Sequence, residues 1–224
     1  MSILVLAPHA DDETLGMGGT IARLVDEGEQ VTVAVLTGHG EEAHPIWPKS
    51  AWDEIRAECV KACAVLGCGE PIYRELPAAL LDATASHEVN RVVGDLIREV
   101  NPRELYIPFA HDLHKDHHAI AYAAVVAARP YLASAGGIER VLAYETVSET
   151  HLTPFAPAFT PNVFVDISAT LQRKLAAMRC YASQLQPDHQ PRSIANLEAL
   201  ARLRGTHMGV AAGEAFALIG EYRR

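Results

Sequence analysis

The first forty residues constrain the fold most, because they alternate between strand, helix and strand. Residues 3–7 form a short apolar run that ends in a polar turn, 15–27 have helical apolar spacing closed by Gly28, and 31–36 are rich in β-branched and apolar residues. This order is a βαβ unit, in which the two strands run parallel and the sheet is buried on both faces. The chain is therefore predicted to have an α/β fold.

The same alternation continues along the rest of the chain. We find no internal repeat, no low-complexity tract and no linker long enough to divide domains, so we expect one domain over residues 1–224. From residue 168 onward the pattern is mostly helical, with Pro187 and Pro191 between two helices. The other expected elements are helices over 51–66, 86–100 and 117–132, strands over 71–74, 105–108 and 140–145, a loop over 153–161 and an extended segment over 162–166.

The composition limits the kinds of molecule that the chain is expected to bind. An apolar content of 49% is enough for a substantial core. The net charge of −9, from 28 acidic and 19 basic residues, argues against broad contact with nucleic acid or an anionic membrane surface. No run approaches the roughly 20 apolar residues of a membrane span, and the first residues lack the basic region of a signal peptide. We expect a cytoplasmic protein with a small-molecule substrate, whose four cysteines are free thiols.

Two polar clusters follow predicted strands, one at residues 8–13 and the other at 111–118. Because ligands of open α/β sheets bind outside the carboxyl ends of the strands, these clusters can meet at one site. His9, Asp12 and His117 are suitable ligands for a divalent ion such as Zn²⁺, which in catalytic sites commonly has three protein ligands and keeps one position for water. The sequence therefore predicts a metal centre.

The remaining polar residues of the clusters suit hydrolysis of an amide. Asp11 is positioned to accept a proton from the attacking water, and His114 to stabilise the oxyanion that forms. Asp116 is expected to orient an imidazole. Each cluster also has a simpler interpretation without catalysis. The acidic residues before Thr14 can cap a helix, and the second cluster can be a solvated polar loop. Four histidines and two aspartates in eight residues are hard to explain by packing.

Residues 8–13, followed by the glycine-rich segment 15–19, resemble the first signature of the PIG-L/LmbE-like N-deacetylases, and residues 114–117 resemble their second signature. The resemblance implies a Rossmann-like α/β sandwich with a mostly parallel sheet and helices on both faces. It also implies zinc-dependent removal of N-acetyl groups from N-acetylglucosamine (GlcNAc) conjugates, and it allows assemblies from single chains to homo-hexamers. Carried over by position, it makes His9, Asp12 and His117 the metal ligands, Asp11 the general base, His114 the oxyanion donor and Asp116 the residue that tunes it.

The chain departs from the family pattern in three places. Ala10 and Lys115 stand where proline is usual, so the two loops lose some stiffness, although no ligand is lost. His118 is an additional imidazole that could compete with His117 for the metal. These departures leave the predicted chemistry in place.

Substrate and ion are less well specified by the sequence. Glu145, Arg56 and the loop around Trp47 are candidates for substrate contact, and specificity is expected from loops 38–50, 78–85 and 146–161. The ligand set alone suits both Zn²⁺ and Fe²⁺. Alternatives that stay open are an amidase acting on a thiol-sugar or antibiotic conjugate, and a non-catalytic sugar- or metal-binding protein.

Rival classes fit the sequence less well. The segment Gly16-Met17-Gly18-Gly19 invites comparison with nicotinamide-binding enzymes, but Ile21 stands where the last glycine of G-x-G-x-x-G is needed. No G-x-S-x-G motif of a serine hydrolase occurs. Cys59 and Cys63 are four apart on a predicted helix, which indicates core packing rather than a metal–thiolate site.

Overall fold

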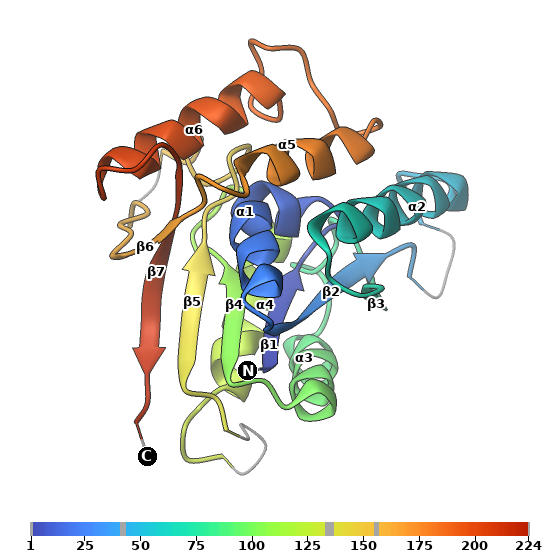
Figure 1. Cartoon of the computed structure of the whole chain (residues 1–224). Helices are drawn as coiled ribbons and strands as arrows, with labels where there is room; N and C mark the ends of the chain where they lie inside the picture. The colour runs from blue at the N-terminus through green and yellow to red at the C-terminus, as the bar shows by residue number, and fades with distance from the viewer. Residues whose placement is uncertain (1, 41–43, 133–136, 155–156, 224) are drawn as a thin grey trace.

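A seven-stranded sheet forms the centre of the protein (Figure 1) in this computed structural model, which describes residues 2–40, 44–132, 137–154 and 157–223. The strands are β1 (Ser2–Ala7), β2 (Gln30–Gly38), β3 (Ile72–Pro77), β4 (Glu104–Pro108), β5 (Arg140–Tyr144), β6 (Val163–Asp166) and β7 (Gly213–Glu221). Their order in the sheet is β3-β2-β1-β4-β5-β7-β6. The first five pair in parallel, whereas β7 runs antiparallel to both β5 and β6. The predicted α/β fold with a mostly parallel sheet is confirmed.

Helices cover both faces of the sheet, as the βαβ pattern predicted (Figure 1). They are α1 (Asp12–Asp26), α2 (Lys49–Leu66), α3 (Ser86–Val100), α4 (Lys115–Ala127), α5 (Leu171–Cys180) and α6 (Ile194–Thr206). Strand β1 shows why two layers are needed: Ile3 and Val5 pack into the core under α1, α2, α5 and α6, whereas Leu4 and Leu6 pack into the core under α3 and α4. Each fully buried aliphatic side chain contributes about 1.5–3 kcal/mol, so a sheet with two apolar faces requires helices on both.

The expectation of mainly helical structure after residue 168 is wrong for the last segment, because 213–221 forms β7. Its apolar run is short and largely unbranched, a pattern that fits a buried helix as well as a strand. Backbone hydrogen bonds to β5 on one side and β6 on the other decide the outcome, and these partners are distant in the sequence. Helix α4 also ends earlier than predicted, at Ala127.

The glycines after β1 serve close packing. A Cβ on Gly16 would lie 2.3 Å from Cδ2 of Tyr144, and one on Gly19 would lie 2.6 Å from Cδ1 of Ile167. The backbone N–H of Gly19 donates to Glu214 at 3.0 Å, which is itself a buried side chain. These glycines thus let Tyr144, Ile167 and Glu214 pack closely against α1.

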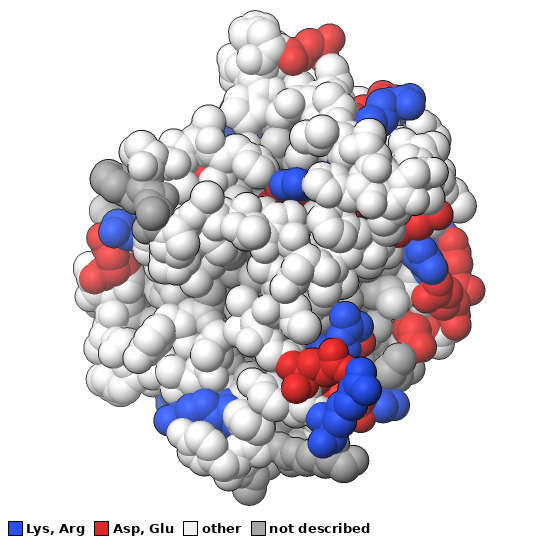
Figure 2. Space-filling view, turned by 90° about the vertical axis from the view of Figure 1, so that its left-hand side faces the viewer, with Lys and Arg blue, Asp and Glu red and all other residues white. Residues whose placement is uncertain are grey.

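Acidic and basic side chains are intermixed on the described surface. Among the described residues, basic and acidic side chains lie next to one another in small groups on the face shown in Figure 2. Within those same residues, no helix is long and apolar enough to cross a membrane. The four cysteines are free thiols.

Candidate active site

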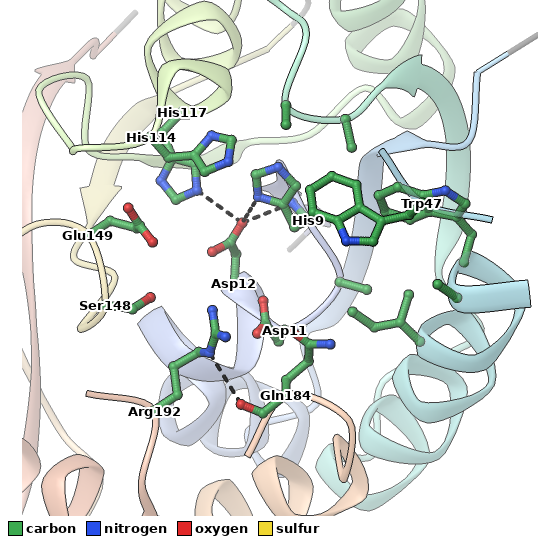
Figure 3. Close-up of a pocket in the computed structure, with 16 residues that line it drawn as sticks. His9, Asp11, Asp12, Trp47, His114, His117, Ser148, Glu149, Gln184 and Arg192 are labelled. Atoms are coloured by element: carbon green, nitrogen blue, oxygen red, sulfur yellow. Dashed lines mark hydrogen bonds and ion pairs between the residues drawn. The ribbon is translucent and has the colours of Figure 1, made fainter. Parts of the chain in front are cut away.

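The two polar clusters meet because β1 and β4 are neighbours in the sheet. The strands pair in parallel, with Ile3 opposite Glu104 and Val5 opposite Tyr106, so their carboxyl ends lie at the same edge. Segment 8–13 leaves the end of β1, and segment 111–118 leads from the end of β4 into α4. Residues more than 100 positions apart thereby line one cavity (Figure 3).

Three side chains form a candidate cation site. Ligand atoms of His9, Asp12 and His117 all lie within 4.8 Å of one another. Oδ2 of Asp12 is the centre of the group, 3.3 Å from Nδ1 of His9 and 3.2 Å from Nε2 of His117. Two imidazoles and one carboxylate form a donor set that suits Zn²⁺ and also Fe²⁺. The sequence predicted this set.

Each of the two histidine ligands is held by a further carboxylate through its other ring nitrogen. Nε2 of His9 lies 3.0 Å from Oδ2 of Asp116, and Nδ1 of His117 lies 2.7 Å from Oδ2 of Asp112. Thr150 in turn donates to Asp112 at 2.6 Å. Such carboxylates fix the tautomer and direction of metal-binding imidazoles. Asp116 thus orients His9, whereas sequence reasoning gave Asp112 no role.

A second group, His9 with His114 and Asp116, also brings three ligand atoms together. However, both oxygens of Asp116 already accept backbone N–H groups, from Ala79 at 2.6 Å and from Leu81 at 3.1 Å. Nδ1 of His114 accepts the N–H of Asp116 at 3.1 Å. These side chains are therefore committed to holding the loop, and the set centred on Asp12 fits a cation better.

The carboxylates around His9 and His117 favour positive charge at the candidate cation site. Burial alone would lower the pKa of His9, but its hydrogen bonds to Asp116 and Asp12 raise it to about 9. In the same way, burial is outweighed by Asp12 and Asp112, which raise the pKa of His117 to about 10. Burial would raise the pKa of Asp12, yet His117 holds it well below its usual range. With these raised values both imidazoles hold a proton at neutral pH, so a metal must displace protons and binds more weakly as pH falls.

Asp11 faces the same cavity without belonging to the cation site. Its backbone has φ 119°, in the region that favours glycine, a conformation that costs of the order of 1–3 kcal/mol and is typical of functional positions. Its Oδ2 is buried and has no hydrogen-bond partner among the described residues. Burial, and then the charge of Asp12, raise the pKa of Asp11 well above its usual range, while Arg192 opposes the rise. This carboxylate is free to take up a proton.

His114 lies beside the cation site, with its ring centroid 4.4 Å from that of His9 and 5.5 Å from that of His117. Because its Nδ1 accepts the N–H of Asp116, the proton of the neutral ring is on Nε2. Burial, and then the charge of His9, lower the pKa of His114 to about 4. At neutral pH the ring is therefore an uncharged N–H donor.

The cavity around these residues has a volume of about 340 Å³. Opposite the imidazoles stands Arg192, whose Nε donates to the carbonyl of Gln184 at 3.2 Å, and beside them stand Ser148 and Glu149 (Figure 3). No motif in the sequence marks these wall residues, which come from loops between distant elements. The other lining residues are His9, Ala10, Asp11, Asp12, Trp47, Ala51, Trp52, Ile55, Ala78, Ala79, His114 and His117.

The structure does not bring the two other candidates for substrate contact into the cavity wall. Glu145 is buried and forms a bidentate ion pair with Arg204, whose Nε and Nη2 donate to its two carboxylate oxygens at 2.8 and 2.6 Å. Arg56 pairs with Glu75 at 2.6 Å. Nε2 of His118 donates to the backbone carbonyl oxygen of Asp112, so it is committed away from the candidate metal ligands. Parts of the specificity loops, 41–43 and 155–156, lie outside the described residues.

Asp112→Ala is expected to weaken metal binding by a factor of about 10–100, because Nδ1 of His117 then loses its acceptor and the ring its fixed direction. Competition with a chelator of known affinity measures the change. Asp82→Ala, at an exposed position, is the matched control. Equal metal affinity in Asp112→Ala and wild type would show that Asp112 does not support the ligand.

At the carboxyl edge of the α/β sheet lie a candidate His–Asp–His cation site and, among the described residues, a buried carboxylate oxygen without a hydrogen-bond partner, an arrangement that suits a hydrolase. The family model described as PIG-L, GlcNAc-PI de-N-acetylase, matches residues 4–128, a range that holds both signatures. The chain belongs to the PIG-L family, and the resemblance seen in the sequence is confirmed.

Relatives of known description agree with this assignment. The chain is 30% identical to a 1D-myo-inositol 2-acetamido-2-deoxy-alpha-D-glucopyranoside deacetylase of Mycobacteroides abscessus, over 95% of this chain and 92% of that protein. It is 29% identical to a diacetylchitobiose deacetylase of Thermococcus kodakarensis, over 83% of this chain and 71% of that protein. The crystal structure of conserved protein TT1542 from Thermus thermophilus superposes with a TM-score of 0.76 at 27% identity, covering 100% and 97% of the two chains. Deacetylases of GlcNAc conjugates are thus among its relatives.

Proposed function

We propose that this protein is a metal-dependent N-deacetylase that hydrolyses the acetamido group of a GlcNAc-type sugar or conjugate. The observation that carries the proposal is the juxtaposition, in one cavity, of the His9, Asp12 and His117 ligand set with Oδ2 of Asp11, which has no hydrogen-bond partner in the described part of the chain. A protein that only bound metal or sugar would not require a strained, unpartnered carboxylate next to the ligands. The deacetylases among its relatives support the same reaction.

The residues fit a divalent ion by the chemistry of their donor atoms and by the carboxylates behind both imidazoles. His9 would bind through Nδ1, His117 through Nε2 and Asp12 through Oδ2, the atoms that face one another. When bound, the ion supplies Lewis acidity, which lowers the pKa of water to about 7 and polarises the amide carbonyl. We propose Zn²⁺ as the native ion, with Fe²⁺ as the alternative.

The chain's own side chains then carry the proton and the developing charge. Asp11 accepts a proton from the attacking water and passes it to the amine nitrogen as the C–N bond breaks, which yields acetate and a primary amine. His114 donates from Nε2 to the carbonyl oxygen, whose negative charge grows in the transition state. Asp116 keeps His9 and the loop at Ala79 in place. Arg192 and Glu149 are available to the sugar hydroxyl groups.

A substrate screen tests this function. The metal-loaded protein is incubated with GlcNAc, N,N′-diacetylchitobiose, GlcNAc-inositol and GlcNAc-malate, and both acetate and primary amine are measured. We expect equal amounts of the two products from at least one glycoside, loss of the activity with a chelator, and recovery with Zn²⁺ or Fe²⁺. If the loaded protein releases acetate from none of these compounds, the proposal is wrong for GlcNAc conjugates.

Other expectations from the sequence stay predictions. They are the single domain, the cytoplasmic location and the absence of a nucleic-acid partner; the oligomeric state stays open between a single chain and a homo-oligomer.

A further inference from the structure

Trp47 stands at the mouth of the cavity, between the metal ligands and the surface. Its side chain lines the cavity and the residue is 42% exposed. The ligands lie deeper: the side chain of Asp12 is 4% exposed and that of His117 only 1%. A group that contacts the indole is therefore the part of a substrate that leaves the cavity, while the reacting amide is at the floor.

The indole is held in place before any ligand binds. His44 accepts the backbone N–H of Trp47 at 3.3 Å on Nδ1, and its Nε2 hydrogen-bonds to the carbonyl oxygen of Ala78 at 2.8 Å. The His44 ring stacks on the indole, with centroids 5.4 Å apart and planes at 27°. Trp52 packs edge-on against the indole at 5.8 Å. A side chain fixed in this way loses little conformational entropy when a ligand covers it.

The two walls of the cavity differ in chemistry. The lining residues Trp47, Ala51 and Ile55, from α2 and the loop before it, are apolar, whereas Ser148 and Arg192 are polar. Trp47 lies on the opposite side of the cavity from Ser148 and Arg192 (Figure 3). A pyranose ring has the same two characters, because its C–H groups form an apolar face and its hydroxyl groups a polar edge. Aromatic side chains bind such faces through large apolar contact, while a few polar groups fix the orientation.

We propose that Trp47 is a binding platform for the ring attached to the acetamido sugar, so that the preferred substrates are glycosides with a second ring. The inference rests on the proposed function and specifies its substrate class. It separates disaccharide-like conjugates from free GlcNAc and from conjugates whose aglycone has no ring. The exposed, preorganised indole at the mouth supplies the contact that those other compounds cannot use.

Binding can be measured apart from turnover, because the chain has only two tryptophans and both line this cavity. In the double variant Asp11→Asn, Trp52→Phe, loaded with Zn²⁺, Trp47 is the sole tryptophan and hydrolysis is suppressed. We expect its emission to change saturably with N,N′-diacetylchitobiose, at concentrations at least about tenfold lower than with GlcNAc. If the emission does not respond, or responds equally to both sugars, Trp47 is not a platform for the second ring.

Steady-state kinetics provide a second test of the role of Trp47. Trp47→Ala should lower kcat/KM for N,N′-diacetylchitobiose about tenfold, mainly through KM, and change the value for GlcNAc less than about twofold. Trp47→Phe should keep most of the activity, and Tyr122→Ala, which removes an exposed aromatic ring outside the cavity, is the control. Equal losses on both sugars would contradict the platform. Emission that responds without any acetate release would refute the proposed function and leave the platform intact.

Discussion

Asp11→Asn is expected to lower kcat by a factor of about 10²–10⁴ while the metal content stays at the wild-type level. Asparagine has the shape of aspartate but cannot accept a proton from water at neutral pH. It also tolerates positive φ better than most residues, so the backbone at φ 119° should be kept. Elemental analysis of the purified variant and steady-state kinetics on the substrate found by the screen measure the two quantities.

The neighbouring carboxylate provides the matched control. Asp12→Asn removes the oxygen that contacts both His9 and His117, so this variant should lose metal as well as activity. The roles would be reversed if Asp11→Asn lost its metal and Asp12→Asn kept it. A pair of variants at adjacent positions thus distinguishes proton transfer from metal binding, because both remove one negative charge from the same cavity.

The candidate metal ligands could be predicted because their positions depend on local rules. Strands followed by polar turns end at one edge of a parallel sheet, and so His9 and His117 had to be neighbours if β1 and β4 were. That step depends on the adjacency of β1 and β4, which the structure shows. The residue types then limited the chemistry to a cation and a hydrolytic water.

Other parts of the site depend on contacts that the sequence does not encode locally. Glu145 was a candidate for substrate contact because it ends a predicted strand, yet Arg204, 59 positions away, pairs with it. Arg192 reaches the cavity on a loop before α6, and nothing nearby in the sequence marks it. Strand β7 was missed for the same reason, since pairing with β5 and β6 determines it. Tertiary partners override local patterns at such positions.

For Asp112, the sequence predicts a position near the site but not a role. It lies in the second polar cluster, five positions before His117, so the sequence placed it near the site. Its role follows only from the turn between β4 and α4, which aims its carboxylate at Nδ1 of His117. The spacing alone gives no such direction, because it depends on the backbone conformation of that turn.

His114→Ala should lower kcat by a factor of about 10²–10³ and change KM little. The donor at Nε2 meets an oxygen that is weakly charged in the substrate and strongly charged in the transition state, so its removal raises the barrier more than it weakens binding. His111→Ala, which removes an exposed imidazole outside the cavity, is the control. An unchanged kcat in His114→Ala would exclude the residue from the mechanism.

The pH dependence gives this prediction a second, independent readout. Since the pKa of His114 is lowered to about 4, its neutral donor form is already complete above roughly pH 5 and is lost only in more acid solution. A bound cation nearby lowers the value further, because it disfavours a second positive charge. The profiles of wild type and His114→Ala between pH 5 and 8 should therefore have the same shape and differ only in height. If the wild-type profile has a limb near pH 6.5 that disappears in His114→Ala, the histidine acts as an acid that must be protonated, and the neutral-donor mechanism is wrong.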